Sequence, residues 1–122
     1  MQTTEWFHQL SHSIRLRLLY LLMGGELCVC ELEEILGIRQ ANVSKHLQKL
    51  KTAGLVEVHR VRQRAFYRLS PRLKEQRTLL AYLSERGHVE DTLVRDRARF
   101  EIHEKTKDAK VYVCNIPEEE KA

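Results

Sequence analysis

Two cysteines separated by one residue carry the most specific chemistry in this sequence. Cys28 and Cys30 lie in the stretch Glu-Leu-Cys-Val-Cys-Glu, residues 26–31. Thiolates are soft ligands, so the pair suits Zn, Cd, Pb, Cu(I) or a trivalent metalloid such as As(III) better than a hard cation. At the start of a helix the dipole would lower the thiol pKa, while the neighbouring glutamates would oppose that effect. We predict a sensor site here; the alternative is a pair of small, buried and inert thiols.

The spacing of the two thiols limits how they can share one ion. In a regular helix, residues i and i+2 lie about 200° apart, whereas in an extended segment they lie on the same face. Chelation by Cys28 and Cys30 therefore requires an extended backbone over residues 28–30. If these residues form the first helical turn when no ion is bound, an ion favours the state in which that turn is unwound. Such a preference is sufficient for a switch.

Residues 39–55 predict the helix that the thiol segment would control. At about 100° per residue, Val43, Leu47 and Leu50 fall on one stripe, and donor-rich side chains point the other way. A shorter predicted helix, residues 31–36, ends at Gly37 just before it, as a helix-turn-helix requires. We predict a DNA recognition helix rather than a solvated surface helix. Its predicted DNA contacts are Gln40, Asn42, Ser44, Lys45, His46, Gln48 and Lys49.

A predicted β-hairpin follows the recognition helix. Residues 56–60 and 65–69 alternate apolar and polar side chains around a basic turn, residues 61–64. Arg62 and Arg64 in this turn suit backbone phosphates or the minor groove, which predicts a wing. The alternative is a solvated hairpin. The expected fold is mainly α with a small β-hairpin, a winged helix-turn-helix that forms a homodimer.

The charge distribution points to a polyanionic partner. Residues 39–74 hold ten Lys or Arg and one acid, so this segment is near +9 although the whole chain is only +4. Double-stranded DNA matches this asymmetry. No stretch is long and apolar enough for a membrane span, and residues 1–10 lack the pattern of a signal peptide, which predicts a cytoplasmic location. No nucleophile–base pair, phosphate loop or paired catalytic carboxylates indicate an enzyme.

The remaining elements predict one folded domain, residues 1–107, and a tail, residues 108–122. Helices are expected at residues 3–10, at 14–22 with Ser11 or Ser13 as cap, at 71–85, and at 88–107 as a charged dimer arm. The first of these helices has Trp6, Phe7 and Leu10 on one side and is expected to pack on the C-terminal helix, of the same chain or of the other subunit. Residues 111–116 could form a short strand. The charged side chains of the last helix are interpreted as solvated; they include Asp96, Glu101, His103 and Glu104.

Several motifs together resemble the ArsR/SmtB family of metal-responsive winged-helix repressors, and its arsenic-responsive branch most closely. They are Glu-Leu-Cys-Val-Cys-Glu-Leu at residues 26–32, Val-Ser-Lys-His-Leu at 43–47, Ala-Gly-Leu-Val at 53–56 and Tyr-Arg-Leu-Ser at 67–70. The resemblance implies a homodimer that binds an inverted-repeat operator and represses a resistance operon. It further implies that As(III) or Sb(III) releases the DNA by binding thiolates. Cys28 and Cys30 match the first two thiols of that branch.

The ligand set departs from that branch in one place. A third cysteine often follows the second by three residues, and Glu33 stands there in this chain. Cys114 could complete a three-sulfur site, or it could be an unattached thiol on the tail. Cd, Pb, Zn or a thiol oxidant remain alternative signals. A constitutive DNA-binding protein with inert cysteines is the alternative from another class, and no other protein partner is indicated.

Overall fold

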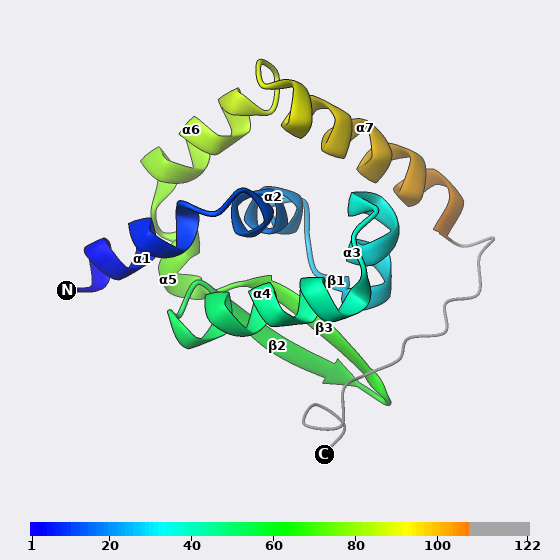
Figure 1. The fold of residues 1–122 in the computed structure, drawn as a ribbon, viewed down its shortest axis with the longest axis horizontal. Helices are drawn as coiled ribbons and strands as arrows, with labels where there is room; N and C mark the ends of the chain where they lie inside the picture. Colours follow the sequence, from blue (N-terminus) through cyan, green and yellow to red (C-terminus); the bar gives the residue numbers. More distant parts are fainter. Residues whose placement is uncertain (108–122) are drawn as a thin grey trace.

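The computed structural model describes residues 1–107, which form seven helices and three short strands (Figure 1). The helices are α1 (Gln2–Leu10), α2 (Ser13–Leu22), α3 (Val29–Leu36), α4 (Gln40–Thr52), α5 (Pro71–Lys74), α6 (Arg77–Arg86) and α7 (Asp91–Thr106). The strands are β1 (Leu27–Cys28), β2 (Val56–Val61) and β3 (Arg64–Leu69). None of these helices is long and apolar enough to cross a bilayer.

Helix α2 lies at the centre of the fold. Figure 1 shows α6 and α7 on one side of it and α4 with the β-hairpin on the other. Leu18, Leu19 and Leu22 of α2 are almost completely buried and belong to the same core cluster as Val43 and Leu47 of α4. The apolar stripe predicted for residues 39–55 is therefore the inner face of α4.

Helices α3 and α4 form the predicted helix-turn-helix. Gly37 ends α3 in the left-handed conformation, with φ of 67°, which a glycine adopts without steric cost. Only Gly37, Ile38 and Arg39 separate α3 from α4. The turn holds the two helices against each other, and α3 also packs against α7.

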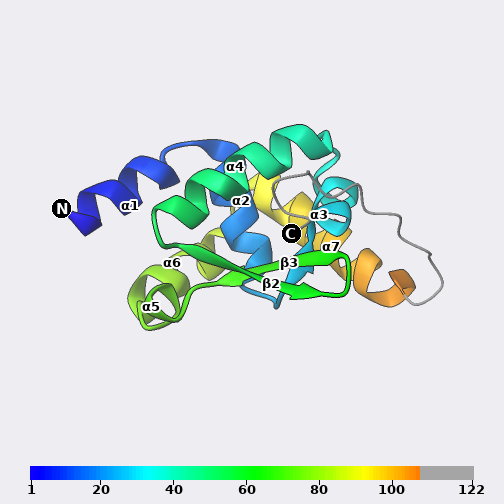
Figure 2. The same ribbon diagram turned by 90° about the horizontal axis from the view of Figure 1, so that it is seen from below.

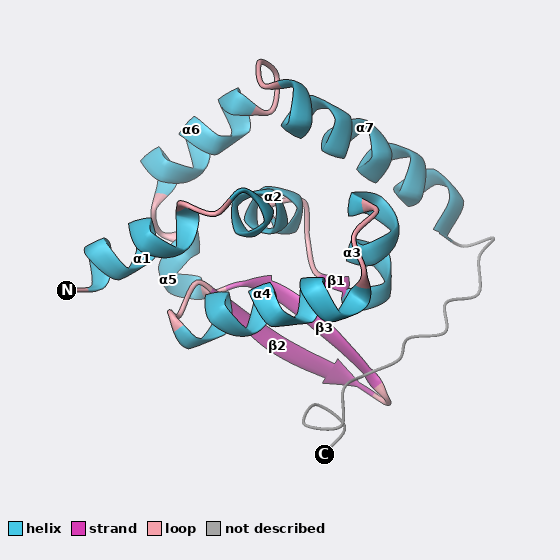
Figure 3. Ribbon diagram, in the orientation of Figure 1, coloured by secondary structure: helices cyan, strands magenta, loops and turns pink. Residues whose placement is uncertain are grey.

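The sheet has three antiparallel strands in the order β1-β3-β2 (Figure 3). Strands β2 and β3 form the predicted hairpin (Figure 2), and we call residues 56–69 the wing. Arg62 in its turn has φ of 58°, a left-handed conformation. Strand β1 was not predicted, because two residues are too short to show an alternating pattern. It places Cys28 opposite Phe66 on β3.

Two details of the prediction are wrong. His12, rather than Ser11 or Ser13, caps α2, because its Nδ1 accepts the Ile14 N–H. The Trp6 indole donates to the Ala53 carbonyl at the end of α4, at 2.9 Å, so within the chain α1 contacts the recognition helix through this residue, and packing of α1 on the C-terminal helix of a second subunit stays a prediction. The helix expected at residues 71–85 is two helices, since non-helical backbone at Gln76 (φ −85°, ψ 69°) separates α5 from α6.

Other predicted features of the C-terminal part have mixed outcomes. Ser70 caps α5 by accepting the Leu73 N–H, and Pro71 occupies the first turn, so a helix begins at residue 71 as predicted. Gly87 ends α6. The strand predicted at residues 111–116 and the position of Cys114 lie outside the described residues.

Candidate DNA interface and thiol site

The outer face of α4 carries the donor-rich surface predicted for DNA contact. Asn42, Lys45 and Lys49 are exposed, and Gln40 and Gln48 are half-buried. The opposite face is held in the core by Val43, Leu47 and Leu50, so the exposed donors have a fixed orientation. Polar and cationic side chains on a rigid helix are the groups that bind phosphates and base edges.

Two predicted contacts on α4 do not lie on that outer face. His46 is 4% exposed, stacks on the His12 ring at 4.4 Å between centroids, and lies 3.4 Å from an Arg15 guanidinium nitrogen. Burial, together with the positive charges of His12, Arg15 and nearby lysines, lowers the His46 pKa to about 4. The ring is therefore neutral at pH 7 and part of the packing, which corrects its assignment as a DNA contact.

Ser44 is also buried, but its hydroxyl has a different status. Its Oγ has no hydrogen-bond partner within residues 1–107. A buried hydroxyl without a partner carries a desolvation cost that a phosphate oxygen at the helix surface could remove. Ser44 therefore stays a predicted DNA contact, although the structure does not expose it as the sequence interpretation assumed.

The two arginines predicted at the wing tip differ in position. Arg62 lies in the exposed turn, where it can reach a phosphate. Arg64 instead points back towards β1: its Nη2 donates to the Cys28 Sγ at 2.9 Å, and its guanidinium carbon lies 5.0 Å from the centre of the Phe66 ring. The structure thus brings a predicted DNA contact to the predicted thiol site, which the sequence did not indicate.

The start of α3 falls between the two cysteines. Cys28 is the N-cap with extended backbone (φ −86°, ψ 166°), and α3 begins at Val29, so Cys30 lies in its first turn. A capping box closes this end, because the Cys28 sulfur accepts the Glu31 backbone N–H and a Glu31 carboxylate oxygen accepts the Cys28 N–H at 3.0 Å. The condition that this segment is helical without an ion is therefore met by Val29 and Cys30, while Cys28 is already extended.

The two sulfurs are in different chemical states. Cys28 is a buried thiol, and burial raises its pKa, although hydrogen bonds from the Glu31 backbone and Arg64 act in the opposite direction. Cys30 is disulfide-bonded. A thiophilic ion would therefore need the Cys30 bond to be reduced before it could engage both sulfurs.

A buried polar chain connects Cys28 to helix α7. Glu31, which caps Cys28, lies with its other carboxylate oxygen 2.6 Å from His103 Nε2. The second nitrogen of His103 lies 3.2 Å from Glu34. Burial alone would raise the Glu31 pKa, but the hydrogen bonds from the Cys28 N–H and His103 outweigh it and lower that pKa. One carboxylate therefore ties the start of α3 to α7.

Comparison with known proteins identifies the family. Residues 12–58 match the model described as "Bacterial regulatory protein, arsR family". A cadmium resistance transcriptional regulatory protein CadC homolog of Staphylococcus aureus is 31% identical over 87 residues, which cover 70% of this chain and 72% of that protein. The chain belongs to the arsR family of bacterial regulatory proteins.

Other relatives and solved structures agree with this membership. The biofilm growth-associated repressor of Xylella fastidiosa is 44% identical over 61 residues (50% of this chain, 54% of that protein). Arsenic resistance transcriptional regulator ArsR1 of Pseudomonas putida is 39% identical over 70 residues (57% and 55%). The chain spans about half the length of these two relatives.

The solved structures show the winged helix-turn-helix fold. Reduced HlyU from Vibrio cholerae matches with a TM-score of 0.60 and 32% identity over 67% of this chain and 87% of that one. The homodimeric winged helix-turn-helix DNA-binding domain of Mb0332 from Mycobacterium bovis matches with a TM-score of 0.62 and 30% identity over 73% and 82%. The predicted fold class of this arsR-family chain is confirmed.

Two residues of α7 that were interpreted as solvated are buried in this arsR-family protein. Asp96 is 1% exposed and accepts two hydrogen bonds from the Arg17 guanidinium, at 2.8 and 3.0 Å. His103 is 2% exposed, whereas Glu101 and Glu104 are exposed as predicted. Leu93, Asp96, Phe100 and His103 follow a helical stripe with steps of three and four residues. That spacing was the available signal that these polar groups face inward.

The described residues offer a soft donor pair but no complete metal site. Within residues 1–107, no three His, Cys, Asp or Glu side chains form a group that could hold a metal ion. Cys30 lines a surface depression of about 510 Å³ with Glu33 and Glu34, which gives a solute access to the start of α3. Two sulfurs from residues 28 and 30 fit As(III) or another thiophilic ion only after local rearrangement of this turn.

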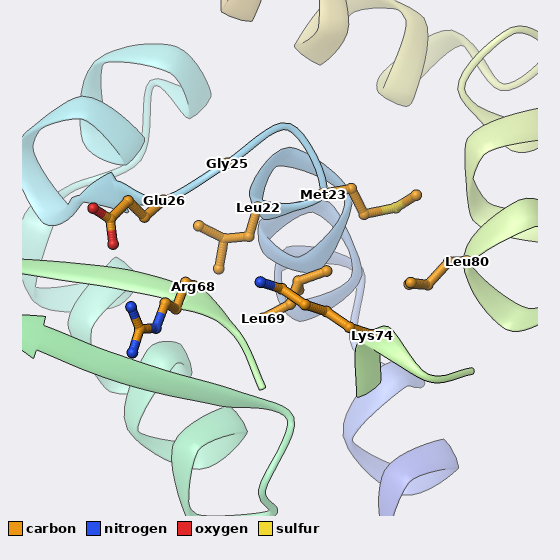
Figure 4. A pocket seen from close by; sticks show the side chains of 8 residues that line it. All are labelled: Leu22, Met23, Gly25, Glu26, Arg68, Leu69, Lys74 and Leu80. Atoms are coloured by element: carbon orange, nitrogen blue, oxygen red, sulfur yellow. The ribbon is translucent and has the colours of Figure 1, made fainter. Parts of the chain in front are cut away.

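A second pocket, of about 520 Å³, has neither Cys28 nor Cys30 in its lining (Figure 4). It is formed by the end of α2, the chain leading to β1, β3, α5 and α6. Its charged lining residues are Glu26, Arg68 and Lys74, and Arg68 is paired with Glu57 at 2.7 Å. This pocket is therefore separate from the thiol site.

Proposed function

We propose that this arsR-family protein is a transcriptional repressor that binds an inverted-repeat operator as a homodimer. Its release follows when As(III) or Sb(III) binds the thiolates of Cys28 and Cys30. The observation that carries this proposal is the position of the two sulfurs across the start of α3, the helix that packs on the recognition helix α4. The relatives named as repressors and as arsenic and cadmium regulators support it.

The geometry suggests a small conformational step. Cys28 is already extended, so only the backbone at Val29 and Cys30 has to leave the helical conformation for both sulfurs to lie on one face. That change removes the capping box and the first turn of α3. Each tenfold preference of the ion for the unwound state corresponds to about 1.4 kcal/mol, and allosteric couplings of about 1–3 kcal/mol are typical. One helical turn can therefore account for the release of DNA.

Exposed apolar side chains support the homodimer. Phe7 of α1, Tyr82 of α6 and Ile102 of α7 are each more than half exposed in the single chain. Exposed large apolar side chains are candidates for a surface that a second copy covers. In a dimer on DNA, the two α4 helices should lie about 34 Å apart to enter successive major grooves. We place the dimerisation and DNA-binding functions in residues 1–107 and the repressor in the cytoplasm with its DNA.

A second candidate signal is oxidation of the thiols. The disulfide-bonded state of Cys30 favours it, because a cysteine that forms such a bond can exchange between reduced and oxidised forms. Cd, Pb and Zn remain alternatives among the thiophilic ions. A constitutive DNA-binding protein is the outcome if no such signal changes the affinity for DNA.

A gel-shift titration separates these possibilities. The protein, reduced with a phosphine, is mixed with an inverted-repeat DNA, and As(III), Cd(II), Zn(II) and peroxide are added in separate series. Release at the lowest concentration by As(III) supports the proposed function, while release by peroxide alone supports the redox alternative. The Cys114→Ser variant then tests the third ligand, because a three-thiolate site should lose As(III) affinity and a two-thiol site should not.

A further inference from the structure

We propose that Arg64 transmits the state of Cys28 to the wing. While Cys28 is a thiol, the Arg64 side chain holds the end of β3 nearest the hairpin turn against β1. A thiophilic ion bound to the sulfur ends this contact. The inference deepens the proposed function and rests on it, since it names a route by which the thiol site reaches DNA. It gives Arg64 a positioning role in place of the phosphate contact predicted from the sequence.

The strand register explains why Arg64 reaches the thiol. Cys28 lies directly opposite Phe66 in the antiparallel β1–β3 pair, so these two side chains share one face of the sheet. Arg64 precedes Phe66 by two residues and therefore lies on the same face, diagonal to Cys28. Its guanidinium lies over the Phe66 ring while Nη2 donates to the sulfur at 2.9 Å. Sulfur and ring thus fix the arginine from two sides.

The attachment is important because β1 is so short. Backbone pairing of β1 with the wing consists of Leu27 with Tyr67 and Cys28 with Phe66. Beyond Phe66 the hairpin continues to its turn, which projects past α4 in Figure 1. The Arg64 side chain extends the contact between β1 and the wing by two residues towards this turn. Loss of that contact would loosen the segment that carries Arg62, the exposed candidate for phosphate binding.

Ion binding makes the sulfur a poorer partner for this contact. When As(III) hydroxide binds a thiol, an As–S bond replaces an As–OH bond, and the thiol proton leaves with the hydroxide as water. No oxidant or reductant is needed. The sulfur keeps two lone pairs, but it now carries an electron-poor arsenic in place of the proton, which occupies space beside the sulfur and repels a neighbouring cation. We expect this bulk and positive partial charge to displace the Arg64 guanidinium from the sulfur.

Cys28 is also connected on its other side. Its backbone N–H is held by Glu31, which contacts His103 of α7. The same thiol therefore lies between the wing and the C-terminal helix. A change at Cys28 would reach the wing through Arg64 and α7 through Glu31, by contacts that do not pass through the core.

The test compares Arg64→Gln with Arg62→Gln, a matched change at the exposed turn. The rate at which iodoacetamide labels Cys28 is measured by peptide mass spectrometry, with and without saturating operator DNA. No ion is added. If DNA binds best when the wing is held in place, then by thermodynamic reciprocity bound DNA should favour the contact between Arg64 and Cys28. We expect DNA to slow Cys28 labelling about fivefold or more in the wild type and in Arg62→Gln, in line with typical couplings, and less than about twofold in Arg64→Gln.

The salt dependence of DNA binding gives a second, independent measure. Arg62→Gln should lower the slope of log K against log salt by about 1, as expected for one lost phosphate contact, while Arg64→Gln should weaken binding with an unchanged slope. Circular dichroism is used to check that both variants are folded. Arg64→Lys, which can still donate to sulfur, should retain DNA protection of Cys28. If Arg64→Gln keeps that protection and lowers the slope by about 1, Arg64 is a phosphate contact and our inference is wrong. Failure of the wild type to bind DNA, or to respond to any ion, would instead contradict the proposed function.

Discussion

Replacing Glu31 should strongly destabilise the protein, because one buried carboxylate makes two contacts. It accepts the Cys28 N–H at 3.0 Å and lies 2.6 Å from His103, and the residue is 6% exposed. A charge-assisted hydrogen bond contributes about 1.5–3 kcal/mol and a helix cap about 1 kcal/mol. We therefore expect Glu31→Ala to lower the free energy of unfolding by about 3 kcal/mol, measured by urea denaturation at pH 7.

Glu34→Ala is the matched control. Glu34 contacts the same histidine from the same helix, but at 3.2 Å and with a side chain that is 38% exposed. A partly solvated pair of this kind contributes about 1 kcal/mol or less. If the two variants unfold at the same urea concentration, the buried connection from Cys28 to α7 does not stabilise the fold and our reasoning fails.

The pH dependence of the Glu31 variant has a defined sign. The folded-state pKa of Glu31 is below its ordinary value of 4.5, so the carboxylate contributes stability above that pH. This contribution is lost as the pH falls through the lowered pKa. The difference in stability between the wild type and Glu31→Ala should therefore be full at pH 7 and decrease below pH 4.5. A constant difference down to pH 3 would contradict an ionised Glu31.

Three further predictions concern the packing, the DNA surface and the thiols. The His46 pKa of about 4 lies below its unfolded value of 6.5, so stability present above pH 6.5 should be lost progressively as the pH falls towards 4. The loss should be about 1–2 kcal/mol after solvent screening. The free energy of unfolding of His46→Gln, measured by urea denaturation, should therefore change less between pH 6.5 and pH 4 than that of the wild type. An equal change in both proteins would contradict a neutral His46 ring at pH 7. Lys45→Ala and Arg62→Ala should each weaken operator binding and lower its salt slope by about 1, and an unchanged slope would remove that residue from the phosphate contacts. Cys28→Ser, whose hydroxyl can still accept a hydrogen bond from Arg64, and Cys30→Ser should bind the operator normally but should not be released by As(III). A variant that fails to bind DNA when no As(III) is added would show that its cysteine has a structural role.

Periodic apolar patterns predicted the parts of the fold that depend on local sequence. The stripe of Val43, Leu47 and Leu50 and the left-handed stop at Gly37 follow from side-chain spacing and backbone conformation, and the structure has both. The hairpin follows from alternation of apolar and polar side chains. The shorter element β1 could not be predicted, because its pairing with β3 is a contact between residues almost forty positions apart.

The connections around the thiol site could not be predicted for the same reason. A basic residue in a turn is most simply interpreted as a DNA contact, and only the register of β1 on β3 shows that Arg64 faces Cys28. His103 and Asp96 lie in a segment rich in charge, where polar residues usually face solvent. Their burial depends on Glu31 and Arg17, partners that are distant in the sequence.

The most direct test of the central claim is the operator affinity of the reduced wild-type protein with and without As(III), measured by fluorescence anisotropy beside Cys28→Ser. We expect As(III) to raise the wild-type Kd about tenfold or more and to leave the Kd of the variant unchanged, as a coupling of typical size requires. The contradicting result is an unchanged wild-type Kd although mass spectrometry shows arsenic bound to both Cys28 and Cys30. The sulfurs at the start of α3 would then not control the affinity for DNA.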